Sequence, residues 1–390
     1  MLSKENKTQF IQNMLEKRKS EDRFRTLKSV KPISAVEVIM NGHKLVNFSS
    51  NDYLGLSKHP YVKQRSIDWI ERYGNGATAS RLICGNVDGL EQIEEKLAAL
   101  KSSETALILN SGFQTNITLI PALADRNTLI LSDELNHNSI VQGCTLARCD
   151  KLIFRHNDTT HLKQLLKDNQ DKGYSRILII TETIFSMDGD CCDLEALREL
   201  SQQFNAILIV DEAHATGVTG PNGMGLANGE MAEIVVGTFG KACGSFGSYI
   251  ACDQSTRDYL INYCSGLIFS TALPPSVLGA IDAALDIVPK MQSERKLLHE
   301  KATFLRSSLK KLGYKTGQST SQIIPVIIGD NVKTLKLATK LEQNNVLATA
   351  IRPPTVPKGT ARIRIALSSE HSWEQIDHLL KLFKEYADAN

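Results

Sequence analysis

The sequence predicts an α/β fold: a mostly parallel central sheet covered by helices, followed by a smaller α+β unit. Between about residues 56 and 290, short apolar runs alternate with amphipathic stretches. Short apolar runs joined by helical crossovers are typical of a parallel sheet that is buried on both faces. The runs that we expect to form strands are 105–109, 128–132, 176–181, 206–210, 234–238 and 248–251.

Length and composition favour a soluble protein of two or three domains. The chain has 390 residues, of which 42% are hydrophobic and 23% charged, and its formal net charge is +2. This balance gives no reason to expect a nucleic-acid or anionic membrane partner. The sequence has neither the ~20-residue apolar run of a membrane span nor the apolar core of a signal peptide. Its eight scattered cysteines lack zinc-ligand spacing, so we expect reduced thiols, no metal and a cytoplasmic location.

Segments on either side of the predicted sheet have their own patterns. Residues 4–28 have the pattern of a polar, basic helix, and Asn41-Gly42 is a strong hairpin signal between strand-like stretches at 36–40 and 44–48. After a long helix at 290–312, strands are expected to alternate with helices, at 323–328, 333–344, 361–367 and 372–388. The expected units are an N-terminal segment 1–55, a large domain 56–290 and a small domain 291–390.

Two strand ends carry residues that are suited to catalysis. One apolar run ends in Asp211, and ligands bind at the carboxyl ends of strands in open α/β sheets. An aspartate there could bind a metal, contact a ribose, pair with a protonated ring nitrogen or simply cap a helix. Lys241 follows another strand among Gly, Phe, Ala and Cys, an apolar setting that would lower its pKa and suit Schiff-base chemistry. The segment around Lys241 lacks the Gly-Lys-Ser/Thr sequence of a P-loop, which disfavours a P-loop NTPase.

Two more strand ends complete a set of groups with related functions. Gly112 and Phe113 precede an apolar helix, so their free amides could cradle a phosphate or belong to a simple helix cap. His137 follows the next strand and, taken alone, could be a capped loop histidine. A phosphate cradle, a flat histidine, a strand-end aspartate and an apolar lysine together meet the needs of pyridoxal 5'-phosphate (PLP).

The sequence resembles the α-oxoamine synthase family of fold-type I PLP enzymes over essentially its whole length. Eight ordered segments carry the resemblance: 47–56, 80–85, 110–113, 132–137, 183–189, 211–217, 238–241 and 352–357. The resemblance implies the PLP-dependent transferase fold type I. It also implies a decarboxylative condensation of an amino acid with an acyl thioester, in a homodimer with shared active sites.

The resemblance also assigns roles to single residues around the cofactor. Lys241 would form the Schiff base and later remove the α-proton of the substrate, Asp211 would pair with the ring nitrogen, and His137 would stack on the ring. Further cofactor contacts are implied for His214 at the ring hydroxyl, for Ser186, Thr238, Gly112 and Phe113, and for Ser270 and Thr271 reaching the partner subunit's phosphate.

The substrate contacts implied by the resemblance involve four residues. Asn51 and Arg364 are similar to positions that hold the amino-acid carboxylate, although one arginine of the pair Arg362 and Arg364 could instead face water. The segment 351–364 is most similar to the biotin-pathway branch, which condenses L-alanine with a pimeloyl thioester, of coenzyme A or a carrier protein, to give 8-amino-7-oxononanoate. In that branch Thr355 would touch the pimeloyl chain and Arg25 its far end, unless Arg25 is merely one cation of a basic helix.

Several other functions stay open from the sequence. Within the family these are a glycine C-acetyltransferase and a serine palmitoyltransferase-like enzyme. An aminotransferase or lyase would use the same lysine and aspartate without needing a thioester. A non-catalytic subunit of a heterodimer would typically lack the lysine, so Lys241, Asp211 and His137 together argue against that possibility.

Overall fold

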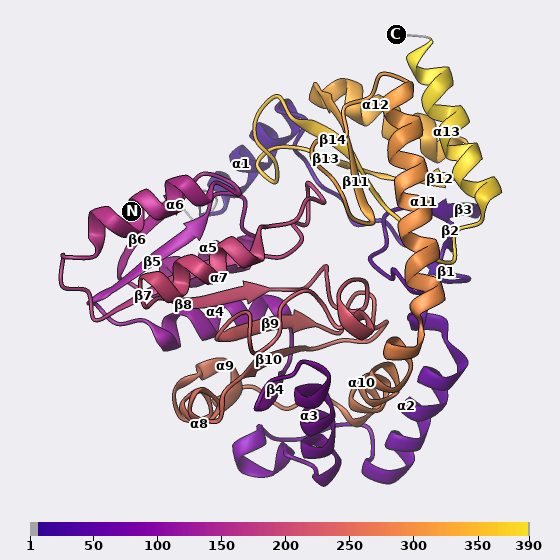
Figure 1. Cartoon of the computed structure of the whole chain (residues 1–390). Helices are drawn as coiled ribbons and strands as arrows, with labels where there is room; N and C mark the ends of the chain where they lie inside the picture. Colours follow the sequence, from indigo (N-terminus) through magenta and orange to yellow (C-terminus); the bar gives the residue numbers. More distant parts are fainter. Residues whose placement is uncertain (1–6, 389–390) are drawn as a thin grey trace.

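A seven-stranded sheet forms the centre of the computed structural model, which describes residues 7–388 (Figure 1). The strands follow the order β4-β10-β9-β8-β7-β5-β6; β10 is antiparallel to both of its neighbours, and the other neighbouring pairs are parallel. This confirms the expected mostly parallel sheet. Its strands are β4 (Thr105–Leu109), β5 (Thr128–Asp133), β6 (Asp150–Phe154), β7 (Arg176–Glu182), β8 (Ile207–Asp211), β9 (Ile234–Thr238) and β10 (Ser248–Cys252).

Six of these strands lie where the sequence places them, and β6 was not expected. β6 is an edge strand, and most of its side chains are exposed or half-buried. It therefore lacks the continuous apolar run that marks the buried strands. By contrast, along β5 the buried side chains of Leu129 and Leu131 pack into one apolar cluster and Ile130 into another. The two clusters lie on opposite faces because alternate side chains of a strand point in opposite directions.

Helices cover both faces of the sheet and connect its strands. The first of them, α2, packs against α10, which leads the chain out of the sheet region. The helices of this part are α2 (Pro60–Tyr73), α3 (Asp88–Leu100), α4 (Gly112–Leu123), α5 (Asn138–Leu146), α6 (Thr159–Asn169), α7 (Leu194–Gln203), α8 (Gln254–Tyr263), α9 (Ser265–Ile268) and α10 (Pro275–Ile287). Short helical turns lie at Leu56–Lys58, Arg81–Gly85, Pro221–Gly223 and Val288–Lys290.

The C-terminal part has its own antiparallel sheet, in the order β11-β14-β13 (Figure 1). The expected long helix and the expected alternation of strands and helices are both present. The elements are α11 (Gln292–Lys311), β11 (Ile323–Gly329), α12 (Asn331–Gln343), β12 (Val346–Leu347), β13 (Thr349–Ile351), β14 (Ala361–Ala366) and α13 (Trp373–Ala387). The expected domain limits, 55/56 and 290/291, stay predictions.

The N-terminal segment is joined to the C-terminal part rather than to the large sheet. The expected hairpin is formed by β2 (Glu37–Met40) and β3 (His43–Asn47), with β1 (Lys31–Pro32) beside β2. β3 also pairs in parallel with β12. This pairing brings the segment just after β3, which includes Asn51, close to residues that lie about 300 positions later in the chain.

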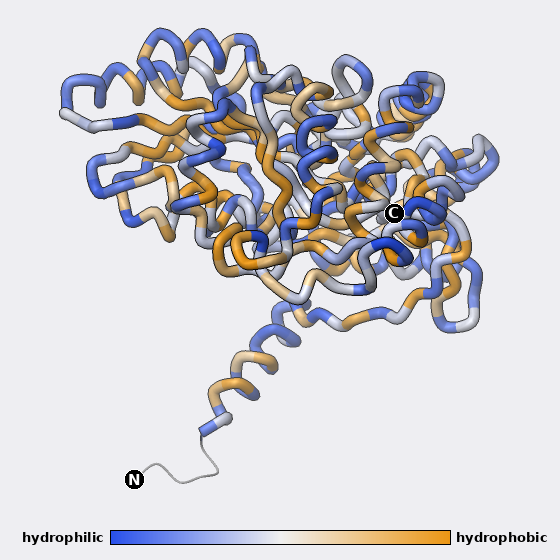
Figure 2. Tube along the Cα trace, turned by 90° about the horizontal axis from the view of Figure 1, so that it is seen from below, coloured by the Kyte–Doolittle hydropathy of each residue, from blue (hydrophilic) through white to orange (hydrophobic). Residues whose placement is uncertain are grey.

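The helix expected at 4–28 is wrong in its extent. Among the described residues it is α1 (Gln9–Ser20), and residues 4–6 lie outside the described range. Asp22 has a φ of 54°, in the left-handed region that ends a helix, and its carbonyl accepts a hydrogen bond from Arg352. Contacts with the C-terminal part therefore hold residues after Ser20 in a non-helical path. Figure 2 shows α1 standing away from the rest of the chain. The side chains of Phe10 and Met14 on this helix are exposed.

Two negative findings apply to the described part of the chain. Across residues 7–388, none of the helices combines the length and the apolar character needed to cross a membrane. Within that same range, no three His, Cys, Asp or Glu side chains are grouped so that they could hold a metal ion.

Candidate active site

A cavity of about 260 Å³ lies at the carboxyl ends of the parallel strands, on the side that faces the C-terminal part. The loops after β5, β7, β8 and β9 each contribute one or two residues, and β14 supplies an arginine. Six of the residues expected from the sequence line this one cavity: Asn51, His137, Ser186, His214, Lys241 and Arg364. Met187, Ser49, Thr349 and Ile351 line it as well.

The amine of Lys241 lies in this cavity beside an imidazole. Its Nζ is 2.7 Å from Nε2 of His214. Loss of hydration lowers the pKa of Lys241 to about 8, although the negative charge of Asp211 acts in the opposite direction. A substantial fraction of this amine is therefore neutral near physiological pH, which is the form that attacks carbonyl carbons and accepts protons.

A chain of hydrogen bonds connects Lys241 to Arg364 across the cavity. Arg364 donates to Asn51 Oδ1 over 3.1 Å, and the hydroxyl of Tyr53 donates to the same oxygen over 3.0 Å. The single hydroxyl proton of Tyr53 is already donated to Asn51. In the 2.7 Å contact between the Tyr53 hydroxyl and His214, Nδ1 of His214 must therefore be the donor.

This assigns the lone pair of His214 to Nε2, where it faces Lys241. Burial lowers the pKa of His214 well below its ordinary value, and the positive charge of Lys241 acts in the same direction. The imidazole is therefore neutral, and it can accept a hydrogen bond from the amine of Lys241.

A second network fixes Asp211 and His137 relative to each other. The amide of Asn116 donates to Asp211 Oδ2 over 2.7 Å and to Ser139 Oγ over 3.0 Å. Ser139 in turn contacts Nδ1 of His137 with both its hydroxyl, at 2.8 Å, and its backbone N–H, at 3.3 Å. Because the backbone N–H can only donate, Nδ1 of His137 is unprotonated.

Glu182, at the end of β7, completes this network. It is paired in register with Asp211 of β8, and its carboxyl accepts a hydrogen bond from the backbone N–H of His137. Burial, together with the negative charge of Asp211, raises the pKa of Glu182 well above its usual range. The raised pKa favours the neutral acid form of Glu182 beside Asp211.

The residues expected to hold a phosphate lie at the start of α4. Gly112 and Phe113 are its first two residues, whose N–H groups have no acceptor within the helix. A Cβ on Gly112 would lie 3.9 Å from the Cβ of Thr238, so the helix start and the end of β9 are adjacent. Ser270 and Thr271 also lie nearby in the same chain, because Gln114 contacts the hydroxyl of Ser270 and Asn110 donates to the carbonyl of Thr271 over 2.8 Å.

Arg25 and Thr355 meet in a second, larger cavity of about 670 Å³. Arg25 donates to the hydroxyl of Thr355 over 3.1 Å, although 330 positions separate the two residues. The cavity is lined by apolar side chains from α12 and β13 and by several cations. It shares Thr349 and Ile351 with the smaller cavity, so the two adjoin.

Sequence reasoning missed four residues that hold the expected groups in place: Tyr53, Asn116, Ser139 and Glu182. Glu182 ends β7, but Thr181 separates it from the apolar run, so it carries a weaker form of the signal that identified Asp211. Tyr53 and Asn116 are polar groups inside or beside the family motifs, and only the fold shows what they contact. The open question about Arg362 is also answered: its guanidinium is buried on the same strand face as Arg364, and it binds Asp188 at 2.6 Å.

These groups fit PLP by the chemistry of their donors. The cofactor needs an amine for its aldehyde, an anion for its ring nitrogen, a flat partner for its ring and N–H or O–H donors for its phosphate. Lys241, Asp211 and His137 supply the first three at one strand edge. The start of α4 supplies the fourth, and its Gly112 leaves the cradle free of a side chain.

Comparison with known proteins finds a matching family and similar proteins along most of the chain. The family described as aminotransferase class I and II matches residues 43–383. A protein of Desulfosudis oleivorans, provisionally named 8-amino-7-oxononanoate synthase, is 53% identical over 97% of this chain and 98% of its own. The 8-amino-7-oxononanoate synthase of Gluconacetobacter diazotrophicus is 46% identical over 93% of each chain.

Solved structures with the same fold include two kinds of synthase. A serine palmitoyltransferase variant from S. paucimobilis with a bound PLP–myriocin aldimine is 25% identical, with a TM-score of 0.91 over 99% of each chain. An 8-amino-7-oxononanoate synthase from Francisella tularensis is 26% identical, with a TM-score of 0.76 over 88% of this chain and 98% of its own.

Proposed function

The chain belongs to the aminotransferase class I and II family and is a PLP-dependent acyltransferase of the α-oxoamine synthase type, and on this premise we propose that it makes 8-amino-7-oxononanoate. It would do so by condensing L-alanine with a pimeloyl thioester, with release of the thiol and carbon dioxide, in biotin biosynthesis. The observation that carries this proposal is the pair of adjoining cavities, one with Lys241 and Arg364 and one with Arg25 and Thr355.

Within this proposal, bound PLP supplies an aldehyde and a protonated ring that withdraws electrons from the α-carbon of the amino acid. Lys241 would hold the aldehyde, and its amine would then take the α-proton, a role for which a pKa of about 8 is well placed. Asp211, held in place by the hydrogen bond from the amide of Asn116, would pair with the ring nitrogen and keep it protonated. His137 would lie on the ring face, His214 would contact the ring hydroxyl, and Ser186 would make a further contact with the cofactor.

The amino acid would be oriented by Arg364 and Asn51. The guanidinium already donates from Nε to the carbonyl of Ser186 over 2.6 Å and from one Nη to Asn51. A guanidinium has five N–H groups, so donors remain to bind a carboxylate in the fork geometry that arginine favours. A carboxylate bound at Arg364 would leave the α-carbon in the cavity that Lys241 also lines, within which the proton would be removed.

The larger cavity would receive the acyl chain. Its apolar lining suits the methylene groups of a pimeloyl chain, whereas an acetyl group would leave most of about 670 Å³ unfilled. The far carboxylate of the pimeloyl group would meet Arg25, beside Thr355. The same wall contains Arg23, Lys28 and Arg352, of which Arg23 and Lys28 are paired with glutamates.

A substrate panel tests this proposal. L-alanine, glycine and L-serine are each combined with pimeloyl-, acetyl- and palmitoyl-coenzyme A, and thiol release is followed together with the mass of the product. We expect turnover to be fastest with L-alanine and the pimeloyl thioester. Turnover with glycine and acetyl-coenzyme A alone would contradict the proposal. Replacing coenzyme A by an acyl carrier protein then identifies the natural donor.

A homodimer with shared sites belongs to the same proposal, as does a cytoplasmic location. In this arrangement Ser270 and Thr271 reach the phosphate bound by the partner subunit. Mixing Lys241→Ala protein with Ser270→Ala/Thr271→Ala protein tests the sharing, since each hybrid dimer would contain one intact site. We expect two inactive or weakly active proteins to regain up to about a quarter of the wild-type activity after subunit exchange. Activity that stays at the level of the unmixed variants would contradict the sharing.

Serine palmitoyl transfer is a second candidate, favoured by the TM-score of 0.91 with a serine palmitoyltransferase. The proteins named for 8-amino-7-oxononanoate synthesis are closer in sequence, at 53% and 46% identity. A palmitoyl chain has no far carboxylate, so Arg25 would have no acyl partner in that reaction. The palmitoyl arm of the substrate panel distinguishes the two functions.

A further inference from the structure

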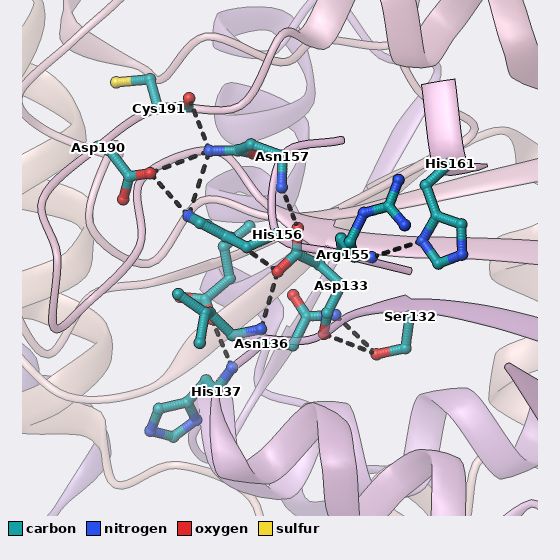
Figure 3. Close-up of polar contacts among 12 residues, drawn as sticks. Ser132, Asp133, Asn136, His137, Arg155, His156, Asn157, His161, Asp190 and Cys191 are labelled. Atoms are coloured by element: carbon teal, nitrogen blue, oxygen red, sulfur yellow. Dashed lines mark hydrogen bonds and ion pairs between the residues drawn. The ribbon is translucent and has the colours of Figure 1, made fainter. Parts of the chain in front are cut away.

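His156 lies outside both cavities and joins Asp133, at the end of β5, to Asp190, in the loop after β7 (Figure 3). Its Nδ1 is 2.9 Å from Asp133 Oδ1, and its Nε2 is 2.7 Å from Asp190 Oδ2. A neutral imidazole has a single N–H, so only the imidazolium can donate to both carboxylates. Although burial alone would lower it, the two aspartates raise the pKa of His156 to about 10, which agrees with this geometry.

On one side, His156 holds the strand end that leads to His137. Asp133 is the last residue of β5, and its carboxylate also accepts from the backbone N–H of Leu135 over 2.8 Å and of Asn157 over 2.9 Å. The chain then passes through Asn136 to His137 in the cavity wall. Asp133 therefore fixes the loop on which His137 is carried, and His156 neutralises its buried charge.

On the other side, His156 holds the loop 185–190, which we call the site loop. Its last residue is Asp190, whose backbone carbonyl accepts a hydrogen bond from the backbone N–H of Phe185 over 3.1 Å. The ring of Phe185 stands edge-on to the imidazole of His156, with 4.4 Å between the ring centroids. The amide of Asn157 reinforces this end by donating to Asp190 over 3.0 Å. The site loop is thus closed at its base by His156.

Both arginines of β14, Arg362 and Arg364, form hydrogen bonds with residues 186–188 of the site loop. Arg364 donates to the carbonyl of Ser186 over 2.6 Å, and Arg362 binds Asp188 at 2.6 Å. Next to them Gly189, with a φ of 69°, lies so close to β11 that a Cβ would be 2.0 Å from the carbonyl oxygen of Ile323. The position of Arg364 therefore depends on where the base of this loop is held.

We propose that His156 is a positioning residue for the amino-acid site: by joining Asp133 to Asp190 it fixes the site loop against the strand end that carries His137, and so places Arg364 relative to Lys241. The inference rests on the proposed function in one respect, the binding of the amino-acid carboxylate by Arg364. In this role His156 acts through Asp133 and Asp190 and does not itself contact the substrate or the cofactor.

The test is a titration of the PLP-loaded protein with an amino acid, followed by the absorbance change of the bound cofactor. The amino acid is whichever of L-alanine, glycine and L-serine gives the largest change in the unaltered protein, so the result is independent of the natural substrate. In His156→Gln, one neutral amide cannot serve both carboxylates. We expect its Kd for the amino acid to rise about tenfold, while PLP content stays at the wild-type level.

Two further variants make this titration decisive. His161→Gln is the matched control, because His161 lies near His156 (Figure 3) but accepts a hydrogen bond from the backbone N–H of Arg155 instead of holding an aspartate. The Kd of this variant for the amino acid should stay at the wild-type value. Asp190→Asn keeps an oxygen that accepts from His156 and removes one charge. It should raise the Kd about threefold, and it decides the matter if His156→Gln does not fold.

A folded, PLP-loaded His156→Gln protein with wild-type amino-acid affinity would overturn the positioning role, even if its thermal stability had fallen. The same holds for an unchanged Kd in Asp190→Asn should the first variant fail to fold. A weakened affinity in both, with normal affinity in His161→Gln, supports it. Failure of the substrate panel would contradict the proposed function without touching this result.

Discussion

The two adjoining cavities are built in different ways. In the smaller one, each predicted catalytic group is held by a residue from another part of the chain: Asp211 by Asn116, His137 by Glu182, and Lys241 by His214. In the larger one, Arg25 and Thr355 are both exposed and contact each other through one hydrogen bond. The smaller cavity is therefore fixed by buried networks, and the larger one is shaped by surface segments.

This difference separates reaction chemistry from substrate choice. Removing one partner from a buried polar network costs much more than losing an exposed contact, because the remaining group stays buried without its partner. Exposed pairs contribute little to stability, so residues such as Arg25 can change without damage to the fold. We infer that relatives with the same buried network can differ in acyl chain by changes in the larger cavity alone.

The largest effect is expected from the smaller cavity, at Asp211. Asp211→Asn keeps the shape of the side chain but removes the anion that would hold the ring nitrogen protonated. We expect exchange of the α-proton of L-alanine with D₂O, measured by NMR, to slow by about 100-fold or more while PLP stays bound. Exchange at the wild-type rate would show that another group has this role.

An intermediate effect is expected from the larger cavity, at Arg25. Arg25→Ala should raise KM for the pimeloyl thioester about tenfold and leave KM for the amino acid unchanged. Arg23→Ala is the matched control, because Arg23 lines the same cavity but is paired with Glu21. Equal effects of the two substitutions would mean that the cavity attracts the acyl carboxylate by general positive charge.

The remaining effect concerns the stability of the fold rather than the reaction, and it comes from His156. Its pKa in the folded protein is about 10, above the value near 6.5 expected in the unfolded chain. Charged His156 therefore stabilises the folded protein fully below about pH 6.5, and this contribution is lost as the pH rises towards 10. The free energy of unfolding should fall by at most about 1.4 kcal/mol per pH unit in this range. Urea unfolding between pH 6.5 and 9.5 measures this slope. It should be flatter in His156→Gln than in the wild type, and equal slopes would contradict the charged state of His156.

The sequence predicted the smaller cavity much better than the larger one. Strands β8 and β9 are continuous apolar runs, and the residues after such runs must meet at one sheet edge, which is why Asp211 and Lys241 could be placed together. Glu182 also ends a strand, but Thr181 separates it from the apolar run 177–180, so it lacks the direct signal that marked Asp211. Tyr53 and Asn116 act through partners about 160 and 95 positions away, and no local pattern shows such contacts.

The larger cavity depends on features that no local pattern contains. The periodicity of residues 4–28 suggested one helix, whereas the chain leaves the helical path after Ser20 and brings Arg25 to Thr355. The parallel pairing of β3 with β12 brings these distant segments into one unit. The resemblance to a known family gave both residues a role, but it did not indicate that they share a cavity of about 670 Å³.

The most direct test of the account is to locate the lysine that holds PLP. The PLP-loaded protein is reduced with borohydride, which fixes the cofactor to its lysine, and the digested peptides are analysed by mass spectrometry. We predict a pyridoxyl group on Lys241, in the peptide that follows β9, and its loss in Lys241→Ala. A pyridoxyl group on any other lysine of the wild-type protein would contradict the central claim that the smaller cavity is the catalytic site.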